Sequence, residues 1–198
     1  MHSDLKFIKS YFKGVSDISD KIDQNIILQI IKKLKNLRKN KGRLFFLGIG
    51  GSAANSSHAV NDFRKLCSIE TYTPTDNVSE FSANINDSGW DSSFAKYLKI
   101  SNINSKDAIF ILSVGGGNKL KKISINLIKS IEFAKSKKTS IISIVGRKDG
   151  FAVKHSDIVL VIPSINKDLV TPYSESFQSI VLHCIVSSPI LQKHKTKW

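Results

Sequence analysis

The stretch RLFFLGIGGSA, residues 43–53, is a short apolar run followed at once by a glycine-rich turn. A short run that is hydrophobic at nearly every position is typical of a strand buried on both faces of a sheet. Behind the turn, residues 52–66 have the spacing of a helix, with Ser52 as a candidate N-cap. This order of strand, turn and helix indicates a parallel α/β sheet.

The same alternation continues along the chain. Apolar runs predict strands at residues 108–112, 140–145 and 157–162, and a weaker one at 68–75. Helical spacing predicts helices at residues 4–14, 20–40, 119–136 and 173–188, and Pro189 should end or kink the last of them. The sequence therefore predicts an α/β fold whose parallel sheet is covered by helices on both faces.

Length and composition narrow the class of protein. The 198 residues are 41% hydrophobic, which suits one domain with a sizeable core and excludes a mainly disordered chain. No run approaches the ~20 apolar residues that cross a bilayer, and residues 1–10 lack a signal-peptide core. Two cysteines are too few for a disulfide framework or a Cys-based zinc site. We therefore expect a cytoplasmic protein with no membrane contact.

The charge is strongly basic, with 30 Lys and Arg against 16 Asp and Glu, a net charge of +14. Such a surface attracts phosphorylated metabolites, nucleic acids or acidic lipids. Nearly all of the basic residues are lysines, whereas proteins that read DNA sequence commonly use bidentate arginine contacts. Small lysine clusters on predicted helices are typical of a solvated face, so nucleic acid is not the expected partner.

Two glycine-rich turns, residues 48–53 and 113–118, each follow a strand and lead into a helix. Backbone N–H groups at such turns bind anions, and loops at neighbouring carboxyl ends of strands line one crevice. The two glycine-rich turns therefore favour a phosphorylated ligand. The first fits the dinucleotide fingerprint only loosely, with Ala53 in place of the third glycine, and the second is no Walker loop. Two tight turns without a ligand are the alternative.

Two pairs of side chains have the spacing of a metal site. His58 and Asp62 share one helix face at i and i+4, and Glu175 and His183 lie two turns apart on the last predicted helix. Two histidines and two carboxylates suit a divalent metal such as zinc. The sequence does not show that the two helices meet, and ordinary surface histidines are the alternative.

These residues together resemble the SIS (sugar isomerase) domain family, and within it the phosphoheptose isomerases. The first loop with His58 and an acid at 62, the pair Asn86-Asp87 in a mid-chain loop, and residues 113–117 in the place of a serine-rich phosphate loop carry the likeness. The helix with Glu175 and His183 resembles the closing metal helix of that family. The likeness extends from about residue 4 to residue 183.

The resemblance implies one SIS domain over residues 1–198, with a five-stranded parallel sheet in the order 2-1-3-4-5. It implies N-terminal helices (residues 1–41) packed at the subunit interfaces of a homotetramer. The activity would be aldose–ketose isomerisation of sedoheptulose 7-phosphate to D-glycero-D-manno-heptose 7-phosphate, or a stereoisomeric equivalent, through a metal-assisted enediol. The product would supply heptose for lipopolysaccharide or a capsule.

The resemblance also implies roles for individual residues. Asp62, Glu175 and His183 would be catalytic, and Zn²⁺ or another divalent metal would bind His58, Asp62, Glu175 and His183. The substrate would contact residues of both loops, the mid-chain pair and the helices: Gly50, Gly51, Ser52, Asp62, Asn86, Asp87, Ser113, Val114, Gly115, Asn118 and Glu175.

Some positions depart from the family pattern. Hydroxyl side chains are replaced at Val114, Gly115 and Asn118, while Asp62 stands for a glutamate and Glu175 for a glutamine. The changed phosphate loop and the net charge of +14 favour an alternative from another class, a non-catalytic SIS module that binds a phosphosugar or a partner protein such as a replication initiator. The two histidines and two carboxylates at metal-ligand positions disfavour it.

Overall fold

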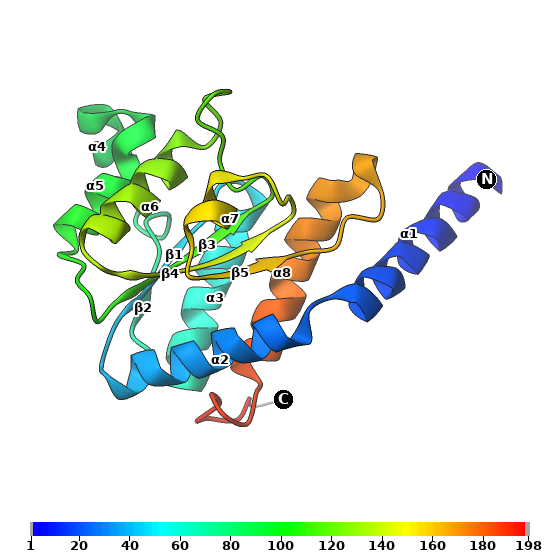
Figure 1. The fold of residues 1–198 in the computed structure, drawn as a ribbon, viewed down its shortest axis with the longest axis horizontal. Coiled ribbons are helices and arrows are strands. Elements are labelled where there is room, and N and C mark those ends of the chain that lie inside the picture. The colour runs from blue at the N-terminus through cyan, green and yellow to red at the C-terminus, as the bar shows by residue number, and fades with distance from the viewer. Residues whose placement is uncertain (1, 197–198) are drawn as a thin grey trace.

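The computed structural model describes residues 2–196 and has a central sheet of five parallel strands (Figure 1). The strand order is β2-β1-β3-β4-β5, as the resemblance implies. The strands are β1 (Leu44–Leu47), β2 (Thr71–Tyr72), β3 (Ala108–Ser113), β4 (Ser140–Val145) and β5 (Ile158–Val161). Every residue of β1 and β3 is buried, which explains their unbroken apolar sequence.

Helices cover both faces of this sheet. One face packs against α1 (His2–Lys21), α2 (Gln24–Lys39), α3 (Gly51–Cys67) and α8 (Val170–Val186). The other face packs against α4 (Val78–Ser88), α5 (Ser93–Ile100), α6 (Ile125–Ser136) and α7 (Phe151–His155). Two 3₁₀ turns, η1 (Trp90–Ser92) and η2 (Lys167–Leu169), lie before α5 and α8. The architecture is the predicted three-layer α/β/α sandwich.

Helix α1 is longer than the predicted segment 4–14 and projects from the rest of the molecule (Figure 1). Gly14 does not end it. A side chain there would collide with the ring of Tyr173, whose hydroxyl donates to the carbonyl of Tyr11 at 2.9 Å. The helix ends before Asp23, whose carboxylate caps α2 by accepting from the N–H groups of Asn25 and Ile26.

The prediction of a helix over 119–136 is wrong at its start, because α6 begins only at Ile125. The backbones of Asn118 and Ile123 pair through N–H···O bonds of 2.9 and 3.0 Å, which close residues 119–122 into a short loop. Lys122 and Ser124 both adopt φ of 52°, outside the right-handed helical region. The helix propensity of the lysine-rich segment is therefore overridden by this pairing.

Candidate active site

Helices α3 and α8 lie side by side and hold the candidate site between them (Figure 1). The side-chain amide of Asn55 donates to the carbonyl of Glu175 at 2.8 Å and to Oε1 of Gln178 at 3.1 Å. Further along, the Cys67 thiol donates to the carbonyl of Val186 at 3.7 Å, and burial raises the pKa of this thiol to about 11. These contacts set the register of the two helices.

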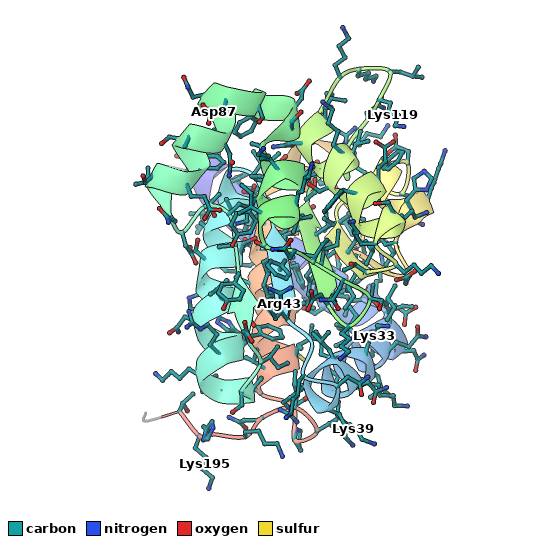
Figure 2. The ribbon with its side chains drawn as sticks, turned by 90° about the vertical axis from the view of Figure 1, so that its left-hand side faces the viewer. Lys33, Lys39, Arg43, Asp87, Lys119 and Lys195 are labelled. Atoms are coloured by element: carbon teal, nitrogen blue, oxygen red, sulfur yellow. The ribbon has the colours of Figure 1, made fainter. Side chains whose placement is uncertain are left out.

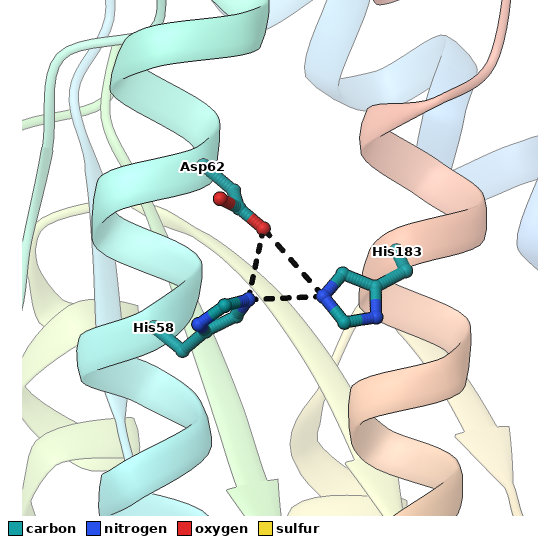
Figure 3. A group of neighbouring side chains, drawn as sticks. All are labelled: His58, Asp62 and His183. Carbon is teal, nitrogen blue, oxygen red and sulfur yellow. Dashed lines mark hydrogen bonds and ion pairs between the residues drawn. The ribbon is translucent and has the colours of Figure 1, made fainter. Parts of the chain in front are cut away.

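His58, Asp62 and His183 meet across this helix pair (Figure 3). The Nε2 atoms of His58 and His183 are 2.9 Å apart, and Oδ2 of Asp62 lies 3.1 Å from the first and 3.7 Å from the second. The Asp62 side chain is 15% exposed, against 55% and 54% for the histidines. The other carboxylate oxygen of Asp62 accepts from Asn61 at 3.1 Å. The carboxylate is thus held while the two imidazoles remain accessible.

The donor set fits a divalent metal ion. Two imidazole nitrogens and one carboxylate oxygen are the ligands of many zinc sites, and ligands around a tetrahedral zinc lie roughly 3.3 Å apart. The separations of 2.9, 3.1 and 3.7 Å bracket that value. Three protein ligands leave a coordination position open, as catalytic zinc sites require. Without an ion, the same atoms satisfy one another by hydrogen bonds when one imidazole donates.

Glu175 does not join the three ligand atoms in the described residues. Its carboxylate lies instead beside Gly51 at the start of α3, where an added Cβ would come within 2.5 to 2.8 Å of the carboxylate atoms. Eight residues separate Glu175 from His183, about 12 Å along the axis of α8. The structure therefore brings together three members of the expected four-ligand set and places the fourth next to the first glycine loop.

The first glycine loop begins α3 with Gly50 rather than with the predicted N-cap Ser52. Gly50 has φ of 63° and ψ of −129°, a conformation that favours glycine, and its carbonyl accepts from the N–H groups of Ala53 and Ala54. Ser52 is buried within the first turn. No side chain caps this helix end, which leaves the geometry that anions use at helix N-termini.

The second glycine loop, residues 113–118, is held by backbone hydrogen bonds from the segment that follows β4. The N–H of Gly116 donates to Oγ of Ser113 at 3.0 Å. The carbonyls of Val114, Gly116 and Gly117 accept from the N–H groups of residues 146, 152 and 151 at 2.8 to 2.9 Å. The loop is thereby fixed at the carboxyl end of β3, the neighbour of β1 in the sheet. Both loops lie at the carboxyl ends of neighbouring strands, the position at which open α/β sheets bind ligands.

Comparison with known proteins decides the family. No family model matches the chain. A curated phosphoheptose isomerase from Buchnera aphidicola subsp. Schizaphis graminum is 31% identical over 164 residues, which cover 80% of this chain and 77% of the relative. This chain belongs to the phosphoheptose isomerase family. It is an enzyme of that family, with an SIS domain.

Solved phosphoheptose isomerases have the same fold. The structure from Francisella tularensis superposes with a TM-score of 0.78 and 20% identity, covering 92% of this chain and 95% of that one. The structure from Neisseria gonorrhoeae gives a TM-score of 0.77 and 20% identity, covering 92% and 96%. Among the described residues of this phosphoheptose isomerase family member, no helix is long and apolar enough to span a membrane.

The pair Asn86-Asp87 does not lie in a loop, as predicted, but in helix α4. Asn77 caps this helix by accepting from the N–H groups of Ser79 and Glu80, and Gly89 ends it with φ of 73°. Both residues are exposed, and the Asn86 amide donates to Asp87 at 3.0 Å. Figure 2 shows Asp87 on this helix. Helix α4 belongs to the sheet face opposite α3 and α8. The structure therefore does not bring this pair to the three clustered side chains.

Ser124 is a candidate substrate-binding residue that the sequence did not predict. The pairing of Asn118 with Ile123 returns the chain to the second glycine loop, so a hydroxyl follows the loop directly in space. Ser124 stands at the N-cap of α6, and its side chain caps no N–H there. A serine just before an apolar helical run was the available signal, but the helix predicted over 119–136 placed this residue inside a helix.

Proposed function

We propose that this enzyme interconverts a ketose phosphate and an aldose phosphate. The ketose is sedoheptulose 7-phosphate, and the aldose is D-glycero-D-manno-heptose 7-phosphate or its stereoisomeric equivalent. The observation that carries the proposal is that His183 of α8 comes within 2.9 to 3.7 Å of His58 and Asp62 on α3, the helix that opens with the first glycine loop. Acid–base groups and an anion site then face one substrate.

The two glycine loops are the proposed phosphate site. The backbone N–H groups near Gly51 and Ser52 would hold the phosphate from one side, and Ser113 and the following backbone from the other. His58 lies seven residues beyond Gly51 on α3, about 10 Å along the helix axis. A substrate held by its phosphate at the loops therefore needs an extended carbon chain to place its carbonyl end at the histidines. A seven-carbon sugar supplies that length.

His183 and a carboxylate carry the proposed proton transfers. One group removes the proton next to the carbonyl, and the other returns a proton at the neighbouring carbon. Asp62 lies within 3.1 and 3.7 Å of both imidazoles, at the carbonyl end of the substrate, which suits its carboxylate to the second transfer. Glu175 lies beside Gly51, at the phosphate end, so its carboxylate would bind hydroxyls of the sugar and hold the chain in position. A divalent ion held by His58, Asp62 and His183 would polarise the carbonyl and stabilise developing negative charge.

The test is incubation with sedoheptulose 7-phosphate in heavy water, with zinc added or with a chelator. NMR follows aldose formation and deuterium at the carbon next to the carbonyl. We expect aldose and deuterium incorporation with zinc and loss of both with the chelator. Exchange that persists with the chelator would remove the metal from the proposal. No exchange with any divalent metal would contradict the isomerase and favour a module that only binds a phosphosugar.

The distance between the glycine loops and the histidines also predicts that kcat/KM depends on the number of carbon atoms in the substrate. A triose phosphate held at the glycine loops cannot reach side chains about 10 Å along α3. Because small misplacements of a reacting group can cost about 100-fold in rate, we expect kcat/KM for dihydroxyacetone phosphate to be at least that far below the value for sedoheptulose 7-phosphate. Comparable values for the two substrates would contradict the assignment of the loops as the phosphate site.

The assembly is proposed to be a homotetramer in which α1 packs against other subunits. Leu5, Phe7, Ile8 and Phe12 are 49 to 67% exposed on the helix that projects from the protomer (Figure 1). An apolar stripe of this kind on an isolated helix is typical of an interface. Helix α1 lies within residues 1–41, which the resemblance places between subunits.

A pair of polar substitutions tests this interface. We expect Phe7→Ser/Phe12→Ser to shift the protein to smaller species in sedimentation velocity, because the apolar area that drives association is removed. Leu120→Ser is the matched control, since Leu120 is 97% exposed on the short loop before α6. Its sedimentation should equal that of the unmodified protein. An unchanged tetramer in the double variant would place the interface elsewhere.

A further inference from the structure

A cavity of about 830 Å³ lies on the α1–α2 side of the molecule, outside the site described above. Its residues come from the junction of α1 and α2, the segment after β4, and the end of β5 with the loop that follows it. None of the residues that line it belongs to the two glycine loops or to the three clustered side chains. Its size is in the range of cavities that hold small molecules and cofactors.

Four cationic side chains line this cavity: Lys21, Arg147, Lys148 and Lys167. They face two carboxylates, Asp23 and Asp149. Asp23 already accepts from two N–H groups as the cap of α2, at 2.9 and 3.1 Å. The balance of charge in the cavity is therefore positive, and part of its negative charge is engaged by the backbone.

Part of the lining of the cavity is apolar. Val161, Ile162 and Pro163 at the end of β5, together with Val170, supply hydrophobic surface to its lining, whereas Arg147, Lys148 and Lys167 are exposed. A lining that combines apolar residues with cationic groups matches a ligand with a ring portion and a phosphorylated end.

The cavity and the second glycine loop share a wall without sharing residues. The segment that carries Arg147 and Lys148 is bound to the loop at both ends, through Gly146 N–H to the Val114 carbonyl at 2.9 Å and Phe151 N–H to the Gly117 carbonyl at 2.8 Å. A molecule in the cavity and a sugar phosphate at the glycine loops would therefore contact different residues.

We propose that this cavity is a second ligand site that binds a phosphorylated small molecule with an apolar ring portion. Arg147 and the neighbouring lysines bind the phosphoryl oxygens, with the guanidinium able to form two parallel hydrogen bonds. The residues from β5 and the following loop pack against the ring. The inference does not depend on the isomerase reaction, because the residues that it uses are not those of the proposed active site.

Calorimetry of the intact protein with ADP as the probe tests the site. Wild-type protein should bind ADP and should not bind adenosine, which lacks the phosphoryl groups. Arg147→Gln/Lys167→Gln should weaken ADP binding at least 10-fold, because charge-assisted hydrogen bonds are lost. Neither side chain makes a hydrogen bond or ion pair with a described residue, so the thermal midpoint should stay unchanged.

The matched control is Lys96→Gln/Lys99→Gln on α5, which removes the same net charge from the opposite face of the sheet. It should leave the ADP affinity within twofold of wild type. Equal weakening in both double variants would show general attraction to a basic protein and overturn the proposal, as would no ADP binding at all. Saturating sedoheptulose 7-phosphate should not displace ADP. Displacement would show that ADP binds at the glycine loops and would also overturn the proposal of a second site.

Discussion

His183→Gln is expected to lower the isomerase rate by about 100- to 10,000-fold, the range that a general acid or base contributes. The Nε2 atom of His183 lies 2.9 Å from His58 and 3.7 Å from Asp62, so glutamine removes both the proposed proton-transfer group and a proposed metal ligand. The side chain is 54% exposed, and its removal should leave the fold intact. The measurements are turnover of sedoheptulose 7-phosphate, bound zinc after dialysis, and the thermal midpoint.

His194→Gln is the control for this variant. His194 is an exposed histidine whose Nε2 lies 3.0 Å from the hydroxyl of Ser68, at the other end of α3. The same substitution there should leave turnover and bound zinc unchanged. Wild-type turnover in His183→Gln would exclude His183 from catalysis, whereas full turnover with reduced zinc would exclude the metal.

The strands were predictable because burial on both faces leaves an unbroken apolar run. All residues of β1 and β3 are buried, and their bounds agree with the sequence to within a residue. Short β2 has only Thr71 and Tyr72, consistent with its weak signal. Helix ends were less predictable, because they depend on local pairing. The bond pair between Asn118 and Ile123 delays α6 in a segment whose lysines would be acceptable in a helix.

The site was predictable only in part for a similar reason. The i, i+4 spacing is local, so the proximity of His58 and Asp62 follows from helix geometry alone. The arrival of His183 depends on the contact between α3 and α8, which Asn55 fixes across more than a hundred residues of sequence. The position of Glu175 depends on its side-chain conformation as well. No spacing rule indicates that its carboxylate lies beside Gly51 rather than with the histidines.

This position of Glu175 leads to the expectation that Gly51→Ala lowers turnover about 100-fold at nearly unchanged stability. An alanine Cβ would come within 2.5 to 2.8 Å of the Glu175 carboxylate, so that carboxylate must move. The end of a glutamate side chain moves at little cost in free energy, and alanine is the better helix former at the start of α3. The cost therefore falls on the position of the bound sugar, where an error of about 1 Å can lower the rate 100-fold.

Gly50→Ala, in contrast to Gly51→Ala, should lower the stability of the protein. Its φ of 63° lies in the region that favours glycine, and no atom outside its own neighbours lies within 4 Å of an added Cβ. The substitution should lower the free energy of unfolding by about 1 to 3 kcal/mol through backbone strain, without pushing on Glu175. Denaturant titration of the two variants separates strain in the loop from displacement of the carboxylate.

A double-mutant cycle then identifies the cause of the activity loss. In a Glu175→Ala background there is no carboxylate for the alanine at 51 to displace, so Gly51→Ala should have almost no further effect on residual proton exchange in heavy water. Additive losses would instead mean that Gly51 acts on the phosphate through its own backbone. Unchanged turnover in Gly51→Ala alone would contradict the role of Glu175 in positioning the sugar, because the carboxylate would then work equally well after leaving the position beside α3.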